Sequence, residues 1–252
     1  MCTPKLRASQ SLILVLVAVA VLTSGGVSRA RNLPLAPSET ITLSAVQDSW
    51  IDINRPAKNF DRHLLSVSNS FGAPGEPDVT TQYVFLEFDL SGVAFEIKSA
   101  TLGLATLTCN GRIPVSGVNV VVYGIGNEPA NDWSETTLTW NTRPNLSAGS
   151  LLIALDAGEI THNTSRRYTW TDDGQGALSS WLETQRTAND SSATLVLAID
   201  KSDQPGLAGV FFEDSEGSGA AYGCPDSIGS PALRLSSDAT RFVFLPTILR
   251  SD

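Results

Sequence analysis

The chain alternates apolar and polar residues over several short runs from Ile41 onward. Because successive side chains of a strand point to opposite faces, this alternation predicts strands with one buried face. The residues expected to face inward are Val84, Leu86, Phe88 and Leu90; Val118, Val120 and Val122; Ala193, Leu195, Leu197 and Ile199; and Leu233 and Leu235. Tyr83 and Tyr123 fall on the opposite faces of their runs.

Two segments depart from simple alternation. The apolar residues of 99–109 change parity, which a β-bulge near Ala105-Thr106 would reconcile. Leu178, Trp181, Leu182 and Gln185 have helical spacing, and Asp173 is a suitable N-cap residue. We therefore expect one short helix between two strands.

Many short strands, turns rich in glycine and proline, and one helical connector predict an all-β fold. The expected architecture is an antiparallel two-sheet β-sandwich, jelly-roll-like, over residues 40–237. Residues 31–39 read as a linker, because two prolines deny the backbone a hydrogen-bonded ladder. Residues 238–252 form an apolar C-terminal tail, interpreted either as a final edge strand or as an attachment point.

The first thirty residues predict a secretory signal peptide and hence a secreted, extracellular protein. A basic start precedes an unbroken apolar run from Leu12 to Leu22, and a small residue ends the segment. The run is shorter than the ~20 residues that a membrane span needs. Cleavage would remove three basic residues and no acidic one, leaving a net charge of −12. This charge argues against nucleic acid as a partner.

Cys109 and Cys224 both follow the predicted signal peptide, and they predict a disulfide. An even number of cysteines in an exported protein favours a bridge on redox grounds. Two buried free thiols are the alternative. A bridge would close a long loop and restrain the glycine-rich segment between Gly217 and Gly229.

A search for catalytic patterns finds none. His63 and His162 lack partners at metal-ligand or helical spacing, and nucleophile elbows and phosphate-cradling glycine loops are absent. Glu213, Asp214 and Glu216 form an acidic cluster, for which a solvated loop, a calcium site and a catalytic pair are the interpretations. A non-enzymatic protein is therefore predicted.

Calcium is the one cofactor that the sequence suggests, in a structural role. Asp48, Trp50 and Asp52 alternate onto one face of the first strand, and Asp61 follows in a loop. Oxygen ligands from Asp48 and Asp61, or from Glu213 and Asp214, could bind it. The alternative for the aspartates is the capping of turns by their side chains.

Aromatic residues are candidate contacts for sugar rings, because the apolar face of a pyranose stacks on them. The candidates are Trp50, Tyr83 and Tyr123. The alternative for each is packing under a loop or the helix, where most aromatic residues are found.

The segment from Asp132 to Pro144, which contains Trp133-Ser134-Glu135 and Trp140, is the most distinctive stretch of the sequence. Ser134 or Thr136 can cap a single helical turn, and Leu138 and Trp140 then show strand spacing until Pro144.

This segment resembles the "W-S-E-x-T-x-T-W-x-x-x-P" signature of the DNRLRE domain, carbohydrate-binding module family 96. Further stretches resemble that family at Asp48–Ile51, Pro56–Asp61, Leu65–Val67, Leu86–Ser91, Ser99–Leu102, Phe212–Glu216 and Pro231–Leu235. Tyr83 and Ser215 stand where the family has arginines, so its ligand site is not expected intact.

The resemblance implies a secreted, non-catalytic module that binds a polysaccharide. The net charge of −12 favours a neutral or weakly charged polymer. A structural or adhesive protein of the cell surface, in contact with the envelope, is the alternative; a polysaccharide lyase or glycoside hydrolase is a third.

Overall fold

The computed structural model describes residues 38–61, 64–70, 80–107, 118–126, 132–144, 146, 151–160, 166–171, 176–188, 191–199, 207–217 and 229–238. All of them lie in one of two compact units of the chain, Pro37–Asp252. The elements are β1 (Thr40–Ser44), β2 (Gln47–Asp52), β3 (Leu65–Ser70), β4 (Thr80–Asp89), β5 (Ser99–Thr106), β6 (Val118–Ile125), β7 (Leu151–Ile160), β8 (Arg166–Thr171), α1 (Ala177–Arg186), β9 (Ser192–Ile199), β10 (Leu207–Phe212) and β11 (Ala232–Ser236).

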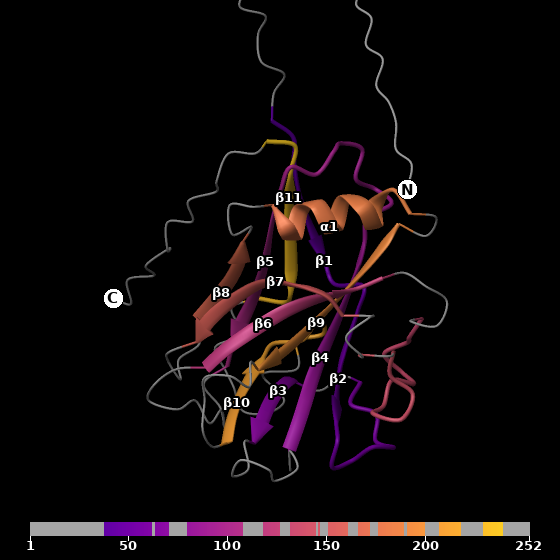
Figure 1. The fold of residues 1–252 in the computed structure, drawn as a ribbon, viewed down its shortest axis with the longest axis vertical. Coiled ribbons are helices and arrows are strands. Elements are labelled where there is room, and N and C mark those ends of the chain that lie inside the picture. Colours follow the sequence, from indigo (N-terminus) through magenta and orange to yellow (C-terminus); the bar gives the residue numbers. More distant parts are fainter. Residues whose placement is uncertain are drawn as a thin grey trace, which may run out of the picture. The chain divides into compact units, whose positions relative to one another are not determined.

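The eleven strands form one hydrogen-bonded sheet in the order β1-β11-β5-β10-β3-β4-β9-β6-β7, with β2 added to β4 and β8 added to β5. Every strand pairing among them is antiparallel. This confirms the predicted all-β, sandwich-like fold (Figure 1).

Hydrogen bonding between strands is continuous through both layers of the sandwich, although two separate sheets had been expected. Two narrow connections are responsible. β10 reaches β5 only through the pair Phe212–Thr106, and β3 reaches β4 only at Thr80–Gln82. One layer is therefore β2-β4-β9-β6-β7, and the other is β1-β11-β5-β8, with β3 and β10 between them.

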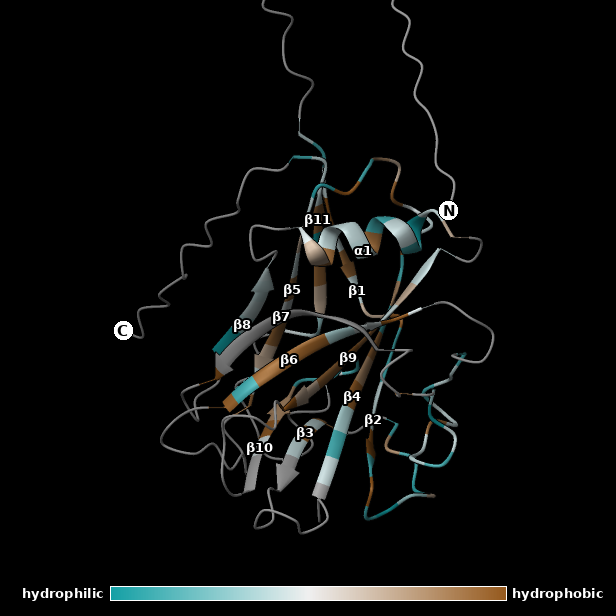
Figure 2. Ribbon diagram, in the orientation of Figure 1, coloured by the Kyte–Doolittle hydropathy of each residue, from teal (hydrophilic) through white to brown (hydrophobic). Residues whose placement is uncertain are grey.

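The main core lies between the two layers and contains the residues that alternation assigned to the inner faces. Val84, Leu86 and Phe88 are fully buried there, with the inward residues of β6, β9 and β11. Figure 2 shows this alternation of hydrophobic and hydrophilic positions along β4 and β6. Across the core, the indole Nε1 of Trp170 in β8 donates a hydrogen bond to the carbonyl of Val120 in β6, at 3.0 Å.

The parity change in 99–109 does not come from a bulge in β5, so that prediction is wrong. The register of β5 is continuous with β11 over Ser99–Gly103 and with β8 over Thr101–Thr106. Leu107 instead leaves the main core and joins a small cluster with Leu64 and Phe211. A register shift is found in β6 instead, where the pairing with β7 is irregular at Tyr123 and Gly124.

Helix α1 lies across one end of the strands and contacts β5, β7 and β9 (Figure 1). Leu178, Trp181, Leu182 and Gln185 are its buried face, as predicted. Its N-cap is Gly176 in the left-handed conformation, with no side-chain cap, and not Asp173. A Cβ at Gly124 would lie 2.4 Å from the Trp181 ring, so this glycine lets the helix approach the sheet.

No helix within the described residues is long and apolar enough to cross a membrane.

Candidate functional site

The segment 132–144 covers the outer face of the layer that contains β4, β6 and β9. Beneath it Ile51, Phe85, Ile125 and Val196 form a second, smaller core with Leu138. Trp133 contacts Phe85 at a ring-centroid distance of 5.7 Å and donates its indole N–H to the Thr194 hydroxyl at 3.1 Å. The segment is thus a packed cover on the sheet, and we refer to residues 132–144 as the connector.

Polar side chains from β2 and from the loop after it hold the connector in place. The Asn59 amide donates to the carbonyls of Glu135 and Leu138, at 2.6 and 2.9 Å. The side-chain amide oxygen of Gln47 accepts from the Glu135 backbone N–H at 3.1 Å. Because these contacts satisfy backbone groups that strands would otherwise pair, the connector is stable without belonging to the sheet.

The local structure of the connector was predicted in part. A single turn begins at Ser134, whose carbonyl accepts from Leu138 N–H at 2.8 Å. The strand expected through Leu138 and Trp140 is absent, because the connector turns again at Thr139–Thr142. There the Thr142 hydroxyl accepts a hydrogen bond from Thr139 N–H and donates one to the Thr137 carbonyl. These bonds satisfy backbone groups that a neighbouring strand would otherwise pair.

Trp50 is in the core, which corrects its expected place as an exposed sugar contact. Its side chain is 8 % exposed, and its ring stacks on Phe60 with centroids 3.7 Å apart. Arg55 and Lys58 lie over Phe60, at 5.9 and 4.6 Å from its ring centre. The alternation of Asp48, Trp50 and Asp52 was correct, but their shared face points inward.

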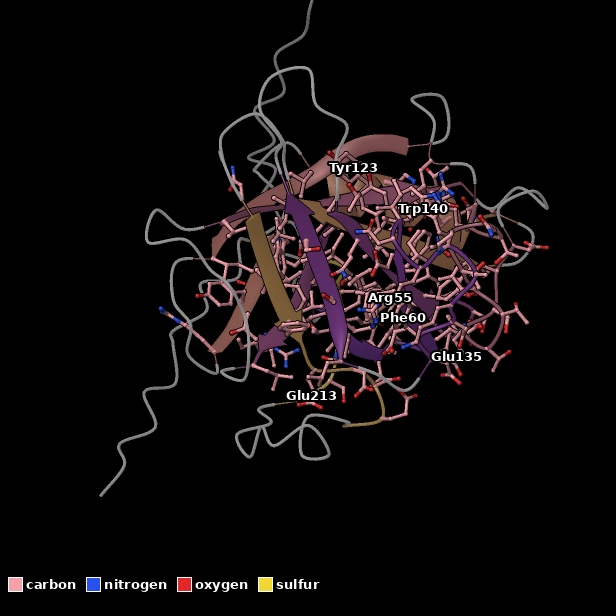
Figure 3. All side chains as sticks on the ribbon, turned by 90° about the horizontal axis from the view of Figure 1, so that it is seen from below. Arg55, Phe60, Tyr123, Glu135, Trp140 and Glu213 are labelled. Atoms are coloured by element: carbon pink, nitrogen blue, oxygen red, sulfur yellow. The ribbon has the colours of Figure 1, made fainter. Side chains whose placement is uncertain are left out.

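Tyr83 and Tyr123 are half-buried at the margin of the second core. Tyr83 stacks on Trp140 at 5.8 Å, and the Arg143 guanidinium lies 4.1 Å from the centre of the Trp140 ring. Trp140 is therefore packed against two neighbours, which reduces the ring surface open to a ligand. Figure 3 shows Tyr123 and Trp140 on the same side of the molecule, away from Glu213.

The acidic candidates are deeply buried. Asp48, Glu213 and Asp214 are 2 %, 0 % and 0 % exposed. The Ser215 backbone N–H donates to the Asp48 carboxylate at 2.7 Å. Burial raises the pKa of Asp48 to about 7; the hydrogen bonds from Ser215 oppose that rise, and the nearby charges of Glu216 and Asp214 add to it.

Within the described part of the chain, no group of three or more His, Cys, Asp or Glu residues is arranged to hold a metal ion. Asp52, at the end of β2, and Asp61, in the loop after β2, make hydrogen bonds to neighbouring residues. The Asp52 carboxylate accepts from Asn54 N–H at 2.9 Å, and the Asp61 N–H donates to the Asn59 side chain at 3.0 Å. Capping of turns, the alternative to calcium, is what the structure shows for Asp52.

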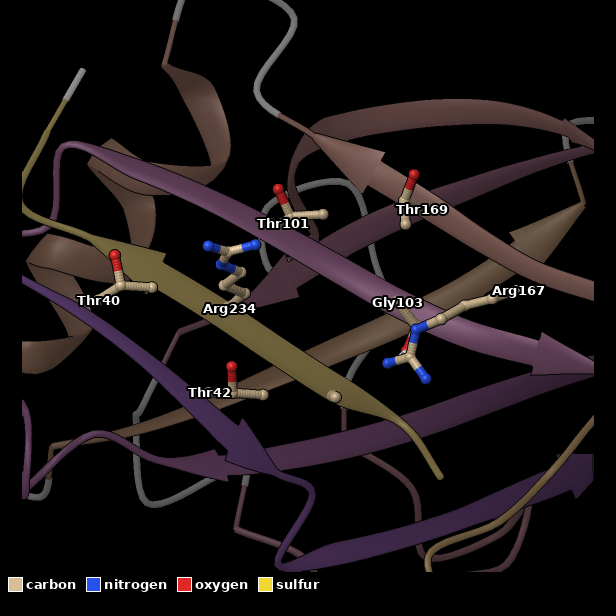
Figure 4. Close-up of a pocket in the computed structure, with 8 residues that line it drawn as sticks. Thr40, Thr42, Thr101, Gly103, Arg167, Thr169 and Arg234 are labelled. Carbon is tan, nitrogen blue, oxygen red and sulfur yellow. Dashed lines mark hydrogen bonds between the residues drawn. The ribbon is translucent and has the colours of Figure 1, made fainter. Parts of the chain in front are cut away.

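The opposite outer face carries a polar pocket that the sequence search missed. Adjacent strands β1, β11, β5 and β8 place outward residues in register: Thr42 opposes Arg234, Arg234 opposes Thr101, and Gly103 opposes Thr169. The pocket encloses about 310 Å³ and is lined by Thr40, Thr42, Thr101, Gly103, Arg167, Thr169, Ala232 and Arg234 (Figure 4).

Alternation is the signal that could have revealed this face. Ile41 and Leu43 face inward on β1, and Leu233 and Leu235 do so on β11, so Thr40, Thr42 and Arg234 must face outward. Sequence alone could not show that four strands carrying threonine and arginine lie next to one another, because their pairing joins residues almost 200 positions apart.

Several residues singled out in the sequence lie outside the described residues: His63, Cys109, His162, Asp173 and Cys224. The disulfide therefore stays a prediction, as do the signal peptide and the role of the tail.

Comparison with known protein families finds a match to carbohydrate-binding module family 96 over residues 39–172, from just before β1 to just after β8. The chain belongs to this family, which confirms the resemblance in the connector and in the first strands. Among solved structures, the K1 cleaved adhesin domain of Lys-gingipain from Porphyromonas gingivalis W83 is similar at 13% identity, with a TM-score of 0.28; the match covers 70% of this chain and 94% of that domain. So distant a likeness does not bear on function. No curated protein sequence matches the chain.

Proposed function

We propose that this member of carbohydrate-binding module family 96 is a secreted, non-catalytic protein that binds a polysaccharide. The proposed site is the pocket on the outer face of β1, β11, β5 and β8. The observation that carries this proposal is the lining of the pocket, which combines four threonines with two arginines on rigid strands.

Such a lining suits a sugar, which presents hydroxyl groups that both donate and accept hydrogen bonds. Threonine hydroxyls can do both, and guanidinium groups donate in a fixed geometry. Thr40, Thr42 and Thr169 are exposed, so a ligand can reach them. A site on paired strands also needs little ordering when the ligand binds.

The buried acids support a binding role over a hydrolytic one. A glycoside hydrolase needs two carboxyl groups that face the substrate across the scissile bond. Glu213 and Asp214 are fully buried, so they are removed from any polymer that lies on the surface.

The connector offers less open ring surface for a ligand. Trp133 packs on Phe85, and Trp140 packs on Tyr83 and Arg143, so these contacts account for both rings without a ligand.

Affinity electrophoresis of the mature protein against plant, algal and bacterial polysaccharides, with and without calcium, tests the proposal. We expect retardation by at least one polymer. The double variant Thr42→Val/Thr169→Val keeps the shape of both side chains and removes their hydroxyls. We expect it to weaken binding roughly thirtyfold, because two lost hydrogen bonds cost about 1 kcal/mol each.

Thr136→Val, in the exposed part of the connector, is the matched control and should bind as the unmodified protein does. Binding to none of the polymers, or a loss caused by Thr136→Val and not by the pocket variant, would contradict the proposed site.

A further inference from the structure

Strand β1 lies at an edge of the sheet, and its backbone has a bonded side and a free side. The Ser237 N–H donates to the Glu39 carbonyl at 3.0 Å, and the Ala45 N–H donates to the Pro231 carbonyl at 3.4 Å. The odd-numbered residues of β1 therefore bond β11. Because bonding alternates along an antiparallel pair, the N–H and C=O groups of residues 40, 42 and 44 point to the opposite side, where β1 has no partner strand among the described residues.

The other edges of the described sheet are covered, and β1 is the exception. Along β2 the Glu135 carboxylate of the connector accepts from the Asp48 N–H at 3.4 Å, and β7 contacts β8 at the far end of the same layer. Residues Thr40–Ser44 include neither a proline nor a charged residue, and their register with β11 has no bulge. These are the usual devices that keep an edge from pairing, so β1 is open to the addition of a strand.

The pattern of β1 is complementary to itself. Ile41 and Leu43 are partly buried at the margin of the main core, and the residues between and beside them are exposed. If a second β1 runs antiparallel with Thr42 opposite Thr42, each apolar side chain lies opposite an apolar one, and each hydroxyl lies opposite a hydroxyl. Cross-strand threonine pairs and apolar pairs both stabilise a sheet.

The charges near β1 permit the approach of a second copy. The net charge of −12 expected for the mature chain opposes association through most of its surface. The pocket beside β1, in contrast, is lined by two arginines and no acidic residue. Figure 4 shows Thr40 and Thr42 on β1 next to Arg234 on β11. In the paired arrangement Arg234 and the partner's Arg234 are three strand spacings apart, about 14 Å, which exceeds the screening length of about 8 Å.

We propose that the free edge of β1 binds β1 of a second copy of this chain, forming a dimer with a two-fold axis at Thr42. The two layers then form one continuous sheet, and both pockets open on the same face of it. The interface does not rest on the proposed function. If the pockets do bind a polysaccharide, one polymer can occupy both, and the dimer binds it more tightly than either copy alone.

Sedimentation velocity of the mature protein over a range of concentrations tests the dimer. A contact limited to one short strand is small, and small interfaces are typical of weak complexes, so we expect a dissociation constant on the order of 10–100 μM. Deletion of residues 239–252 should leave this constant unchanged, because the apolar tail has no part in the proposed contact.

Thr42 would oppose itself across the two-fold axis, so charges introduced there test the register. Thr42→Lys alone and Thr42→Glu alone each place like charges opposite one another, and we expect both variants to be monomers. An equal mixture of the two should form a heterodimer, because opposite charges then face each other. Thr42 is exposed, so neither substitution disturbs the core.

Thr136→Lys and Thr136→Glu are the matched controls, since they make the same changes of charge at an exposed position of the connector. Both should dimerise as the unmodified protein does. A monomer at every concentration, or a mixture of the two Thr42 variants that associates no better than each variant alone, would overturn the inference. So would a dimer that is lost on deletion of the tail and kept in both Thr42 variants. Retardation by a polysaccharide of a protein that stays monomeric would leave the proposed function standing and remove only the dimer.

Discussion

Asp48 illustrates how the position of one residue sets its chemistry. It lies on the inward face of β2, where Ser215 N–H is its hydrogen-bond donor and Asp214 and Glu216 are nearby. The hydrogen bonds from Ser215 do not compensate the carboxylate for the loss of water, so burial keeps its pKa at about 7. The alternation of the sequence predicted which residues share this face. It could not show that the residues on both faces of β2 are buried.

Asp48 should make the protein less stable as pH rises. Its folded-state pKa is raised above the unfolded value of 3.8, so its contribution is fully present below about pH 4 and is lost as pH rises through about 7. The full effect has an upper limit on the order of 4 kcal/mol. Asp48→Asn keeps an oxygen that can accept from Ser215 and cannot ionise.

Urea unfolding of both proteins at pH 5 and pH 8 measures this effect. The variant should be more stable than the unmodified protein at pH 8, and the difference should shrink or reverse at pH 5. A difference that is the same at both pH values would show that Asp48 does not titrate in this range.

At the scale of elements, the connector is the feature that sequence reasoning explained least. Leu138 and Trp140 were assigned to a strand, which the structure does not have. Strand spacing over three residues is a weak signal, and here threonine hydroxyls and Asn59 supply the backbone partners. For helix α1, the spacing of four apolar and amide residues predicted the buried face correctly. The start of the helix, at a left-handed glycine, was not predicted.

Asn59 should be essential for the packing of the connector. Asn59→Ala removes two hydrogen bonds to connector carbonyls and leaves those carbonyls without this partner. We expect a loss of about 2–3 kcal/mol in the free energy of unfolding. Intrinsic fluorescence should also change, because Trp133 and Trp140 depend on the connector for their partial burial.

Thr136→Ala is the control for this variant, since its hydroxyl bonds only to Ser134 on the exposed side of the connector among the contacts described. Its stability should lie within about 0.5 kcal/mol of the unmodified protein. If Asn59→Ala is equally mild, the connector is held chiefly by its tryptophans.

At the scale of the whole molecule, the sequence predicted the sandwich because alternation reports which side of each strand is buried. It could not report which outer face is covered and which is open. Phe85 and Val196 are outward-facing yet buried, because the connector lies on them. Thr42 and Arg234 are outward-facing and form a pocket, because no segment of the described chain fills it. The candidate site therefore depends on pairings between distant strands, for which local patterns carry no information.

The predicted bridge between Cys109 and Cys224 belongs to the same scale, because it would join two distant parts of the chain. Cys109 follows β5 by three residues, and Leu107 N–H bonds the Phe211 carbonyl, so the chain leaves β5 beside β10. Cys224 lies between Gly217, which follows β10, and Gly229, which precedes β11. Closing a loop of this length would stabilise the fold by about 4–5 kcal/mol in the chain-entropy model, and usually by less in practice.

We expect no free thiol in the mature exported protein and a melting temperature that falls under reductant. Quantitative thiol labelling of the unfolded, unreduced protein measures the first, and calorimetry with and without reductant measures the second. The variant Cys109→Ser/Cys224→Ser should melt at the lower temperature under both conditions. Two reactive thiols per chain would rule out the bridge.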